Sequence, residues 1–98
     1  LLLSHLPEHA PILLLDIKGK EISSETLATK IDTYALSGSS QLVFIIGGSD
    51  GVTSEVKQHA TERISFGPIT LPHNLARVVL LEQLYRAFKI SRGEPYHK

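Results

Sequence analysis

The sequence predicts a layered α/β domain with a parallel sheet, and three observations favour this fold class. Residues 12–17 and 42–46 are short, nearly continuous apolar runs, typical of strands buried on both faces. Stretches with helical periodicity follow each run, so strands and helices alternate along the chain. The length of 98 residues allows one domain.

The first strand is expected over residues 12–17, because the Lys18-Gly19-Lys20 sequence that follows is typical of a turn and ends the strand. Ser23 or Ser24 can cap the next helix, in which Glu25 complements the helix dipole. Its apolar stripe comprises Leu27, Ile31, Tyr34 and Ala35, and Gly38 suits its C-terminal end.

The second strand, residues 42–46, runs into the glycine-rich turn 47–51. Thr53 or Ser54 can cap a short helix with Val56 and Ala60 on its apolar side. Residues 64–66 form a weak third strand, and residues 67–73 form a loop without regular periodicity.

The last long helix is expected over residues 72–91, with Pro72 in its first position and Asn74 as the competing cap. Its apolar side chains span roughly 200° of the helix, whereas a surface helix needs only about 100° to cover a core. We therefore expect it to pack both on the sheet and on a second copy of the chain, with Leu80 and Leu84 in the dimer interface.

Arg77 stands within this apolar arc, where a buried guanidinium needs a partner. One interpretation is an intramolecular bridge to Asp16 or Glu82, and the other is a contact across a dimer or with a bound anion.

Composition excludes several classes of site. The chain has no cysteine, so it has no disulfide, thiolate zinc site or thiol nucleophile. No HExxH motif accompanies its five histidines, and we expect no metal. No apolar run approaches the ~20 residues that span a bilayer, so we expect no membrane partner.

Charge is unevenly spread. Residues 77–98 carry a net charge of +3 and residues 1–76 a net charge of −3. The basic end either attracts an anionic partner or is only a solvated helix face. The terminal Tyr96-His97-Lys98 either stacks a base and holds a phosphate or simply frays.

Two loops are candidate ligand sites. Gly47-Gly48 follows a buried strand, at the sheet edge where α/β proteins bind ligands, although it matches neither GxGxxG nor a P-loop and can equally be a plain turn. The loop 66–72 offers uncommitted backbone groups that suit the edge of a purine base, or it is only a crossover connection.

Several motifs together resemble one family. They are FIIGGSDG at 44–51, ISF at 64–66, TLPH at 70–73, RV at 77–78, EQLYRAFKI at 82–90 and GEPYHK at 93–98. In combination they resemble the ribosomal RNA large subunit methyltransferase H family, small SPOUT enzymes that methylate N3 of a pseudouridine in 23S rRNA.

The resemblance implies that residues 1–98 form a single SPOUT methyltransferase domain, the C-terminal portion of a family fold whose N-terminal strand-helix-strand part is missing here. It implies a deep trefoil knot, S-adenosylmethionine as methyl donor, and a cytoplasmic homodimer that acts on 23S rRNA within the ribosome and not on DNA. The donor-binding positions would be Leu15, Gly47, Gly48, Phe66, Gly67, Pro68, Ile69, Thr70 and Leu71. Tyr96, His97 and Arg77 would act on the substrate side.

Two other functions stay open. A non-catalytic ribosome- or RNA-binding module could keep this fold without the chemistry. A generic nucleotide-binding α/β enzyme would bind ATP or NAD, but the sequence lacks the phosphate-loop and dinucleotide motifs that such enzymes carry.

Overall fold

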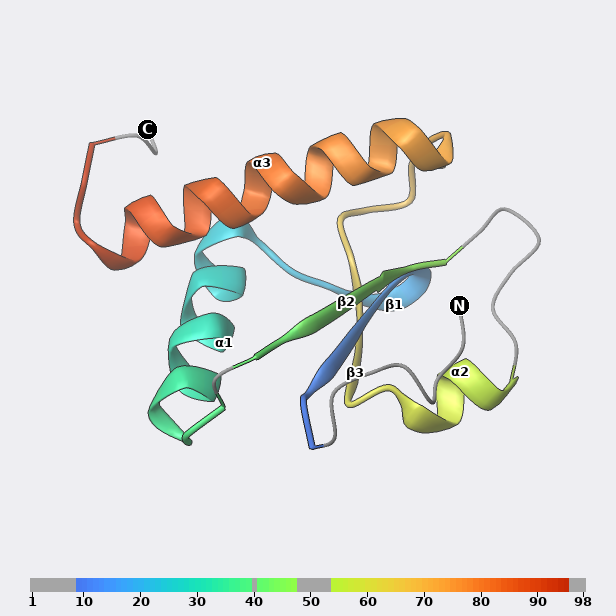
Figure 1. Ribbon diagram of the computed structural model, residues 1–98. Coiled ribbons are helices and arrows are strands. Elements are labelled where there is room, and N and C mark those ends of the chain that lie inside the picture. Colours follow the sequence, from blue (N-terminus) through green and yellow to red (C-terminus); the bar gives the residue numbers. More distant parts are fainter. Residues whose placement is uncertain (1–8, 40, 48–53, 96–98) are drawn as a thin grey trace.

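The computed structural model describes residues 9–39, 41–47 and 54–95. Its elements are β1 (Ile12–Glu21), α1 (Ser24–Leu36), β2 (Val43–Ile46), α2 (Ser54–His59), β3 (Glu62–Ser65) and α3 (His73–Ser91). The strands form one sheet in the order β2-β1-β3, and both pairings are parallel. In Figure 1, α1 and α2 lie on opposite sides of the strands, and α3 crosses over α1. The predicted α/β class with a parallel sheet is therefore confirmed.

β1 is longer than the sequence suggested. Its first half pairs with both neighbours, up to Leu15 opposite Ile46 of β2 and Ile64 of β3. The pairing with β3 then shifts register and resumes at Lys20. The expected end at residues 18–20 was wrong, because the chain continues through a bulge across β3. Gly19 permits this crossing, since a Cβ atom there would lie 2.7 Å from the backbone carbon of Arg63.

The third strand also differs from its expected bounds. It begins at Glu62, earlier than predicted, and it ends at Ser65, so Phe66 already belongs to the following loop. α2 contains no buried residue.

α1 begins as the sequence predicts. Ser23 is its N-cap and accepts a hydrogen bond from the Thr26 N–H. Ser37 is the C-cap, and Gly38 follows with a φ of +92°, the left-handed conformation that glycine adopts without strain.

α3 begins one residue later than expected. Pro72 is its N-cap and makes no side-chain capping bond, so neither of the expected arrangements, Pro72 as the first helical residue or Asn74 as a cap, is present. A hydrophobic cluster joins α1 and α3; its buried members are Leu27, Ala28, Ile31 and Ala87. Ser24 hydrogen-bonds Gln83 and Asp32 hydrogen-bonds Ser91 along the same contact.

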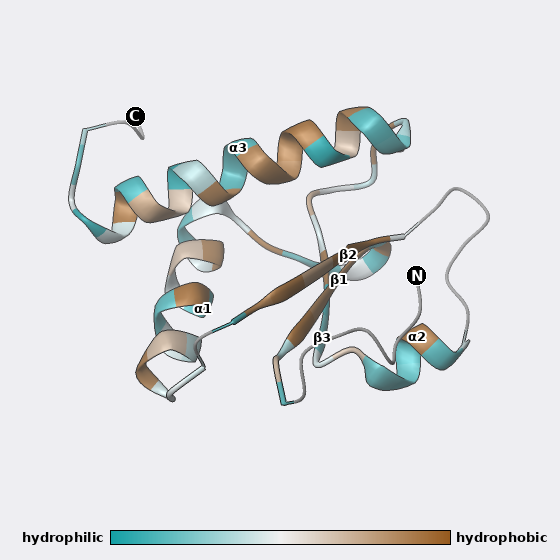
Figure 2. Cartoon of the chain, in the orientation of Figure 1, coloured by the Kyte–Doolittle hydropathy of each residue, from teal (hydrophilic) through white to brown (hydrophobic). Residues whose placement is uncertain are grey.

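Only part of the apolar arc of α3 is used in this packing. Leu80 is buried within its own chain, so its expected place in an intermolecular interface was wrong. Leu84 is partly buried against the core cluster, and its place in an interface stays a prediction. A different stripe of α3 is exposed; it comprises Leu75, Val78, Leu81, Tyr85 and Phe88. Figure 2 shows that hydrophobic residues are spread along the length of α3. The helix therefore has more apolar surface than its own domain covers.

Candidate functional site

The strand order creates a topological switch point at β1. From β1 the chain crosses through α1 to β2 on one side, and through α2 it then reaches β3 on the other side. In open α/β sheets, ligands bind outside the carboxyl ends of the strands at such a point. The carboxyl end of the paired part of β1, flanked by the ends of β2 and β3, is therefore the candidate site.

Leu15 and Gly47 meet at this edge. The Gly47 N–H donates a hydrogen bond of 2.8 Å to the carbonyl of Leu15. Leu15 is also paired with Ile64 of β3. Since neighbouring strands lie about 4.8 Å apart, Gly47 and the end of β3 are separated by about 10 Å, with Leu15 between them.

The segment 66–71 leaves β3 at the same edge. Gly67 has a φ of +123°, so the chain turns there in a conformation that side chains disfavour. The N–H and the carbonyl of Gly67 both hydrogen-bond the Ser65 hydroxyl, each at 3.1 Å. The Phe66 side chain instead packs against the core cluster.

Beyond Gly67 the segment is open to ligands. Pro68, Ile69 and Thr70 are exposed, and Ile69 keeps 77% of its accessible surface. With the residues that the structure describes, the backbone of Ile69, Thr70 and Leu71 makes no hydrogen bond. These donors and acceptors can therefore be satisfied by water or by a ligand.

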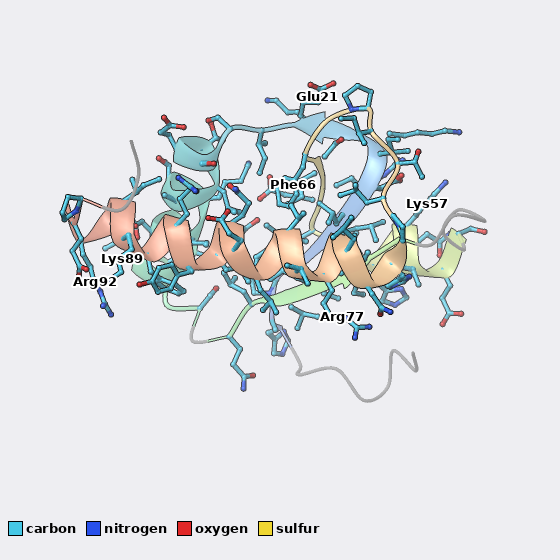
Figure 3. All side chains as sticks on the ribbon, turned by 90° about the horizontal axis from the view of Figure 1, so that it is seen from above. Glu21, Lys57, Phe66, Arg77, Lys89 and Arg92 are labelled. Carbon is cyan, nitrogen blue, oxygen red and sulfur yellow. The ribbon has the colours of Figure 1, made fainter. Side chains whose placement is uncertain are left out.

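The structure thus brings Leu15, Gly47 and the segment 66–71 to one edge of the sheet. Gly48, Tyr96 and His97 lie outside the described residues. Arg77 is exposed and extends from α3 away from Phe66 (Figure 3).

Of the two interpretations of Arg77, the intramolecular bridge to Asp16 or Glu82 was wrong. Asp16 pairs with Arg63 and Glu82 with Arg86, and no ion pair within residues 9–39, 41–47 and 54–95 involves Arg77. The reason is geometric: the helix turns this side chain toward solvent, where a guanidinium needs no protein partner.

Sequence reasoning missed an ion pair beside Leu15. The Arg63 guanidinium lies 2.8 Å from a carboxylate oxygen of Asp16, and the other oxygen accepts a hydrogen bond from the Lys18 N–H. Burial alone would raise the pKa of Asp16, but the hydrogen bonds from Lys18 and Arg63 outweigh it and lower the pKa. The only signal in the sequence was a single carboxylate within the apolar run at residues 12–17.

Among the described residues, no group of three or more His, Cys, Asp or Glu side chains is placed to hold a metal ion. No helix in this part of the chain has the length and apolar character needed to cross a membrane.

Comparison with known proteins shows which family this chain is similar to. The profile of a family described as "Predicted SPOUT methyltransferase" matches residues 1–97. A protein from Listeria monocytogenes serotype 4a, named ribosomal RNA large subunit methyltransferase H, is 52% identical over 97 residues. A protein of the same name from Bacillus thuringiensis is 50% identical. A protein from Methanococcus maripaludis, named putative ribosomal RNA large subunit methyltransferase H, is 47% identical.

Each alignment covers 99% of this chain and 61% of the relative. The chain therefore spans about three-fifths of the length of these curated relatives.

Proposed function

The chain belongs to the SPOUT methyltransferase family, and we propose that it transfers the methyl group of S-adenosylmethionine to N3 of a pseudouridine in 23S rRNA. The proposal extends to an assembled ribosomal surface as substrate, a homodimer as the active form and the cytoplasm as the place of action. It also includes the trefoil knot that the family resemblance implies.

One observation carries the proposal. The switch point at β1 coincides with the positions at which the resemblance expects the donor, since Leu15, Gly47 and the segment 66–71 share one edge of the sheet. Strand order alone points to this edge as a ligand site, independently of any family motif.

The residues at this edge suit an adenosyl group. Ile69 and Leu71 supply apolar side chains, and the backbone groups of residues 69–71 can bond the polar edge of a purine. Gly47 presents no side chain, so a ligand can approach its backbone closely. Neither a metal nor a phosphate-binding loop is needed for this ligand.

Bound S-adenosylmethionine supplies an electrophilic methyl group on a sulfonium. In the reaction the sulfur–carbon bond breaks with its electron pair going to sulfur, a bond to N3 forms, and the N3 proton passes to a base. The chain's contribution is mostly positioning, because holding both reactants in line removes much of the barrier. We assign His97 and Tyr96 to the substrate side, with Arg77 available to an RNA phosphate or a partner chain.

The exposed stripe of α3 supports the homodimer. Val78 and Leu81 keep 60% and 61% of their surface exposed, and Leu75, Tyr85 and Phe88 keep about half. Monomeric proteins rarely expose such continuous apolar surface, and an isologous interface would cover it. Arg77 borders this stripe, so it would lie at the edge of the dimer contact.

Calorimetric titration with S-adenosylmethionine tests the donor site. We expect saturable binding that Gly47→Arg abolishes, because the new side chain would fill the space beside Leu15. Ala35→Arg adds the same charge on the exposed part of α1 and should leave the affinity unchanged. Binding that survives Gly47→Arg would remove this edge from the account.

A methylation assay on ribosomal particles separates enzyme from binding module. Deleting residues 96–98 should abolish transfer of a labelled methyl group while leaving donor affinity intact. A non-catalytic RNA-binding module, the second candidate, predicts RNA binding without donor binding in the wild-type chain.

A further inference from the structure

We propose that Arg63 and Ser65, on one face of β3, are positioning residues that hold both sides of the donor site in place. This inference rests on the proposed function, because the segments that they hold are the proposed donor-binding segments. Alternation along the strand places these two side chains on the same face and Glu62 and Ile64 on the other.

Ser65 fixes the segment that follows β3. Ser65 is 1% exposed as a residue, and it is the one buried polar residue in the described part of the chain. Its hydroxyl donates to the Gly67 carbonyl and accepts from the Gly67 N–H, so both backbone polar groups of that residue are bound to one side chain. Since Gly67 is in a conformation open chiefly to glycine, the hydroxyl selects one of many conformations that this residue can adopt.

Arg63 fixes the segment that follows Leu15. Its guanidinium holds Asp16, whose carboxylate also binds the Lys18 N–H and so shapes the start of the bulge in β1. The backbone of Arg63 lies directly against Gly19 at the end of the same bulge. Arg63 therefore contacts both ends of the segment 16–19, and the Leu15 carbonyl that binds Gly47 immediately precedes it.

On the opposite face of β3, the Glu62 side chain contacts α1 and not the donor-binding segments. Glu62 lies 2.5 Å from the Lys30 ammonium and hydrogen-bonds the Tyr34 hydroxyl, both on α1. These contacts join helix to sheet at the amino end of β3, away from the candidate site. Glu62→Gln is therefore a matched control: it lies on the same strand and weakens the fold without touching the donor segments.

Two measurements test the proposal in the intact protein. By calorimetry with S-adenosylmethionine, we expect Ser65→Ala and Arg63→Gln each to raise the Kd at least tenfold, and Arg63→Lys to recover part of the loss. Glu62→Gln should change the Kd less than twofold. By amide hydrogen exchange, Ser65→Ala should accelerate exchange at Gly67 at least tenfold, whereas Glu62→Gln should not.

Different outcomes of these measurements contradict the positioning role and the proposed function. Unchanged donor affinity in both β3 variants, or an equal loss in Glu62→Gln, would overturn the proposal and leave these residues a purely structural role. If the wild-type chain binds no donor, the proposed function fails. Exchange at Gly67 then decides whether Ser65 orders the segment, and an unchanged rate would refute that as well.

Discussion

Replacing Leu81 with glutamate should convert the proposed homodimer into a monomer. Leu81 lies at the centre of the exposed stripe of α3 and keeps 61% of its surface in the isolated chain. The substitution leaves the core cluster in place, because Leu81 is neither a member of that cluster nor packed against it. The monomer should therefore fold as before.

The expected magnitude follows from the exposed surface. Burying a whole leucine side chain contributes about 1.5–3 kcal/mol, so covering the exposed part of Leu81 contributes roughly 1–2 kcal/mol. A two-fold interface contains this residue twice, which doubles the effect to roughly 2–4 kcal/mol. The dimer Kd should then rise about 30- to 700-fold, and desolvation of the two carboxylates adds to this loss.

Sedimentation velocity over a range of protein concentrations measures the effect. Leu36 is 90% exposed near the end of α1, outside the stripe, so Leu36→Glu makes the same chemical change without affecting association. A wild-type chain that stays monomeric, or a Leu81→Glu chain that dimerises with unchanged Kd, would refute the assignment of this interface.

Three further predictions concern stability. Gly19→Ala places Cβ 2.7 Å from the Arg63 backbone, so urea denaturation should show a loss of about 1–3 kcal/mol, and an unchanged midpoint would contradict the close crossing. Burial and the Glu62 carboxylate raise the pKa of Tyr34 from 10.0 to about 12, so its stabilisation is complete below pH 10 and lost as the pH rises toward 12. The melting temperature of Tyr34→Phe should fall less over this interval, and an equal fall would argue against the pair. Burial alone would raise the pKa of Glu62, but the hydrogen bonds from Lys30 and Tyr34 lower this pKa below 4.5. The free energy of unfolding should therefore fall as the pH drops through the lowered pKa. Glu62→Gln should reduce this loss of stability at acid pH.

The parallel α/β fold was predictable because its signals are local. The apolar runs at 12–17 and 42–46 and the Ser23 cap need only neighbouring residues to be recognised. The extent of β1 was not predictable in this way. Lys18-Gly19-Lys20 has the composition of a turn, and its continuation as strand depends on Gly19 lying against Arg63, a contact between residues far apart in the sequence.

Helical periodicity identified the excess apolar surface of α3 but placed Leu80, which is buried, in the proposed interface. Leu80 and Leu81 are adjacent in sequence, and the width of the arc gives no information on which of them is buried. Only the folded structure shows that Leu80 is buried and Leu81 exposed.

The candidate site shows the same limit. The glycine pair and the proline-containing loop were visible as motifs, whereas the supporting residues were not. Asp16 and Arg63 are 47 positions apart, and Ser65 stands between two apolar residues with no pattern to mark its buried hydroxyl. Residues that hold the segments of a site in position act through tertiary contacts, and a single sequence does not show such contacts.

A crystal structure of the chain with S-adenosylhomocysteine, the demethylated donor product, tests the central claim most directly. The account predicts the adenine edge on the backbone of residues 69–71 and the rest of the adenosyl group between Leu15 and Gly47. An adenosyl group bound elsewhere on the molecule, with no contact to the ends of β1, β2 and β3, would contradict it.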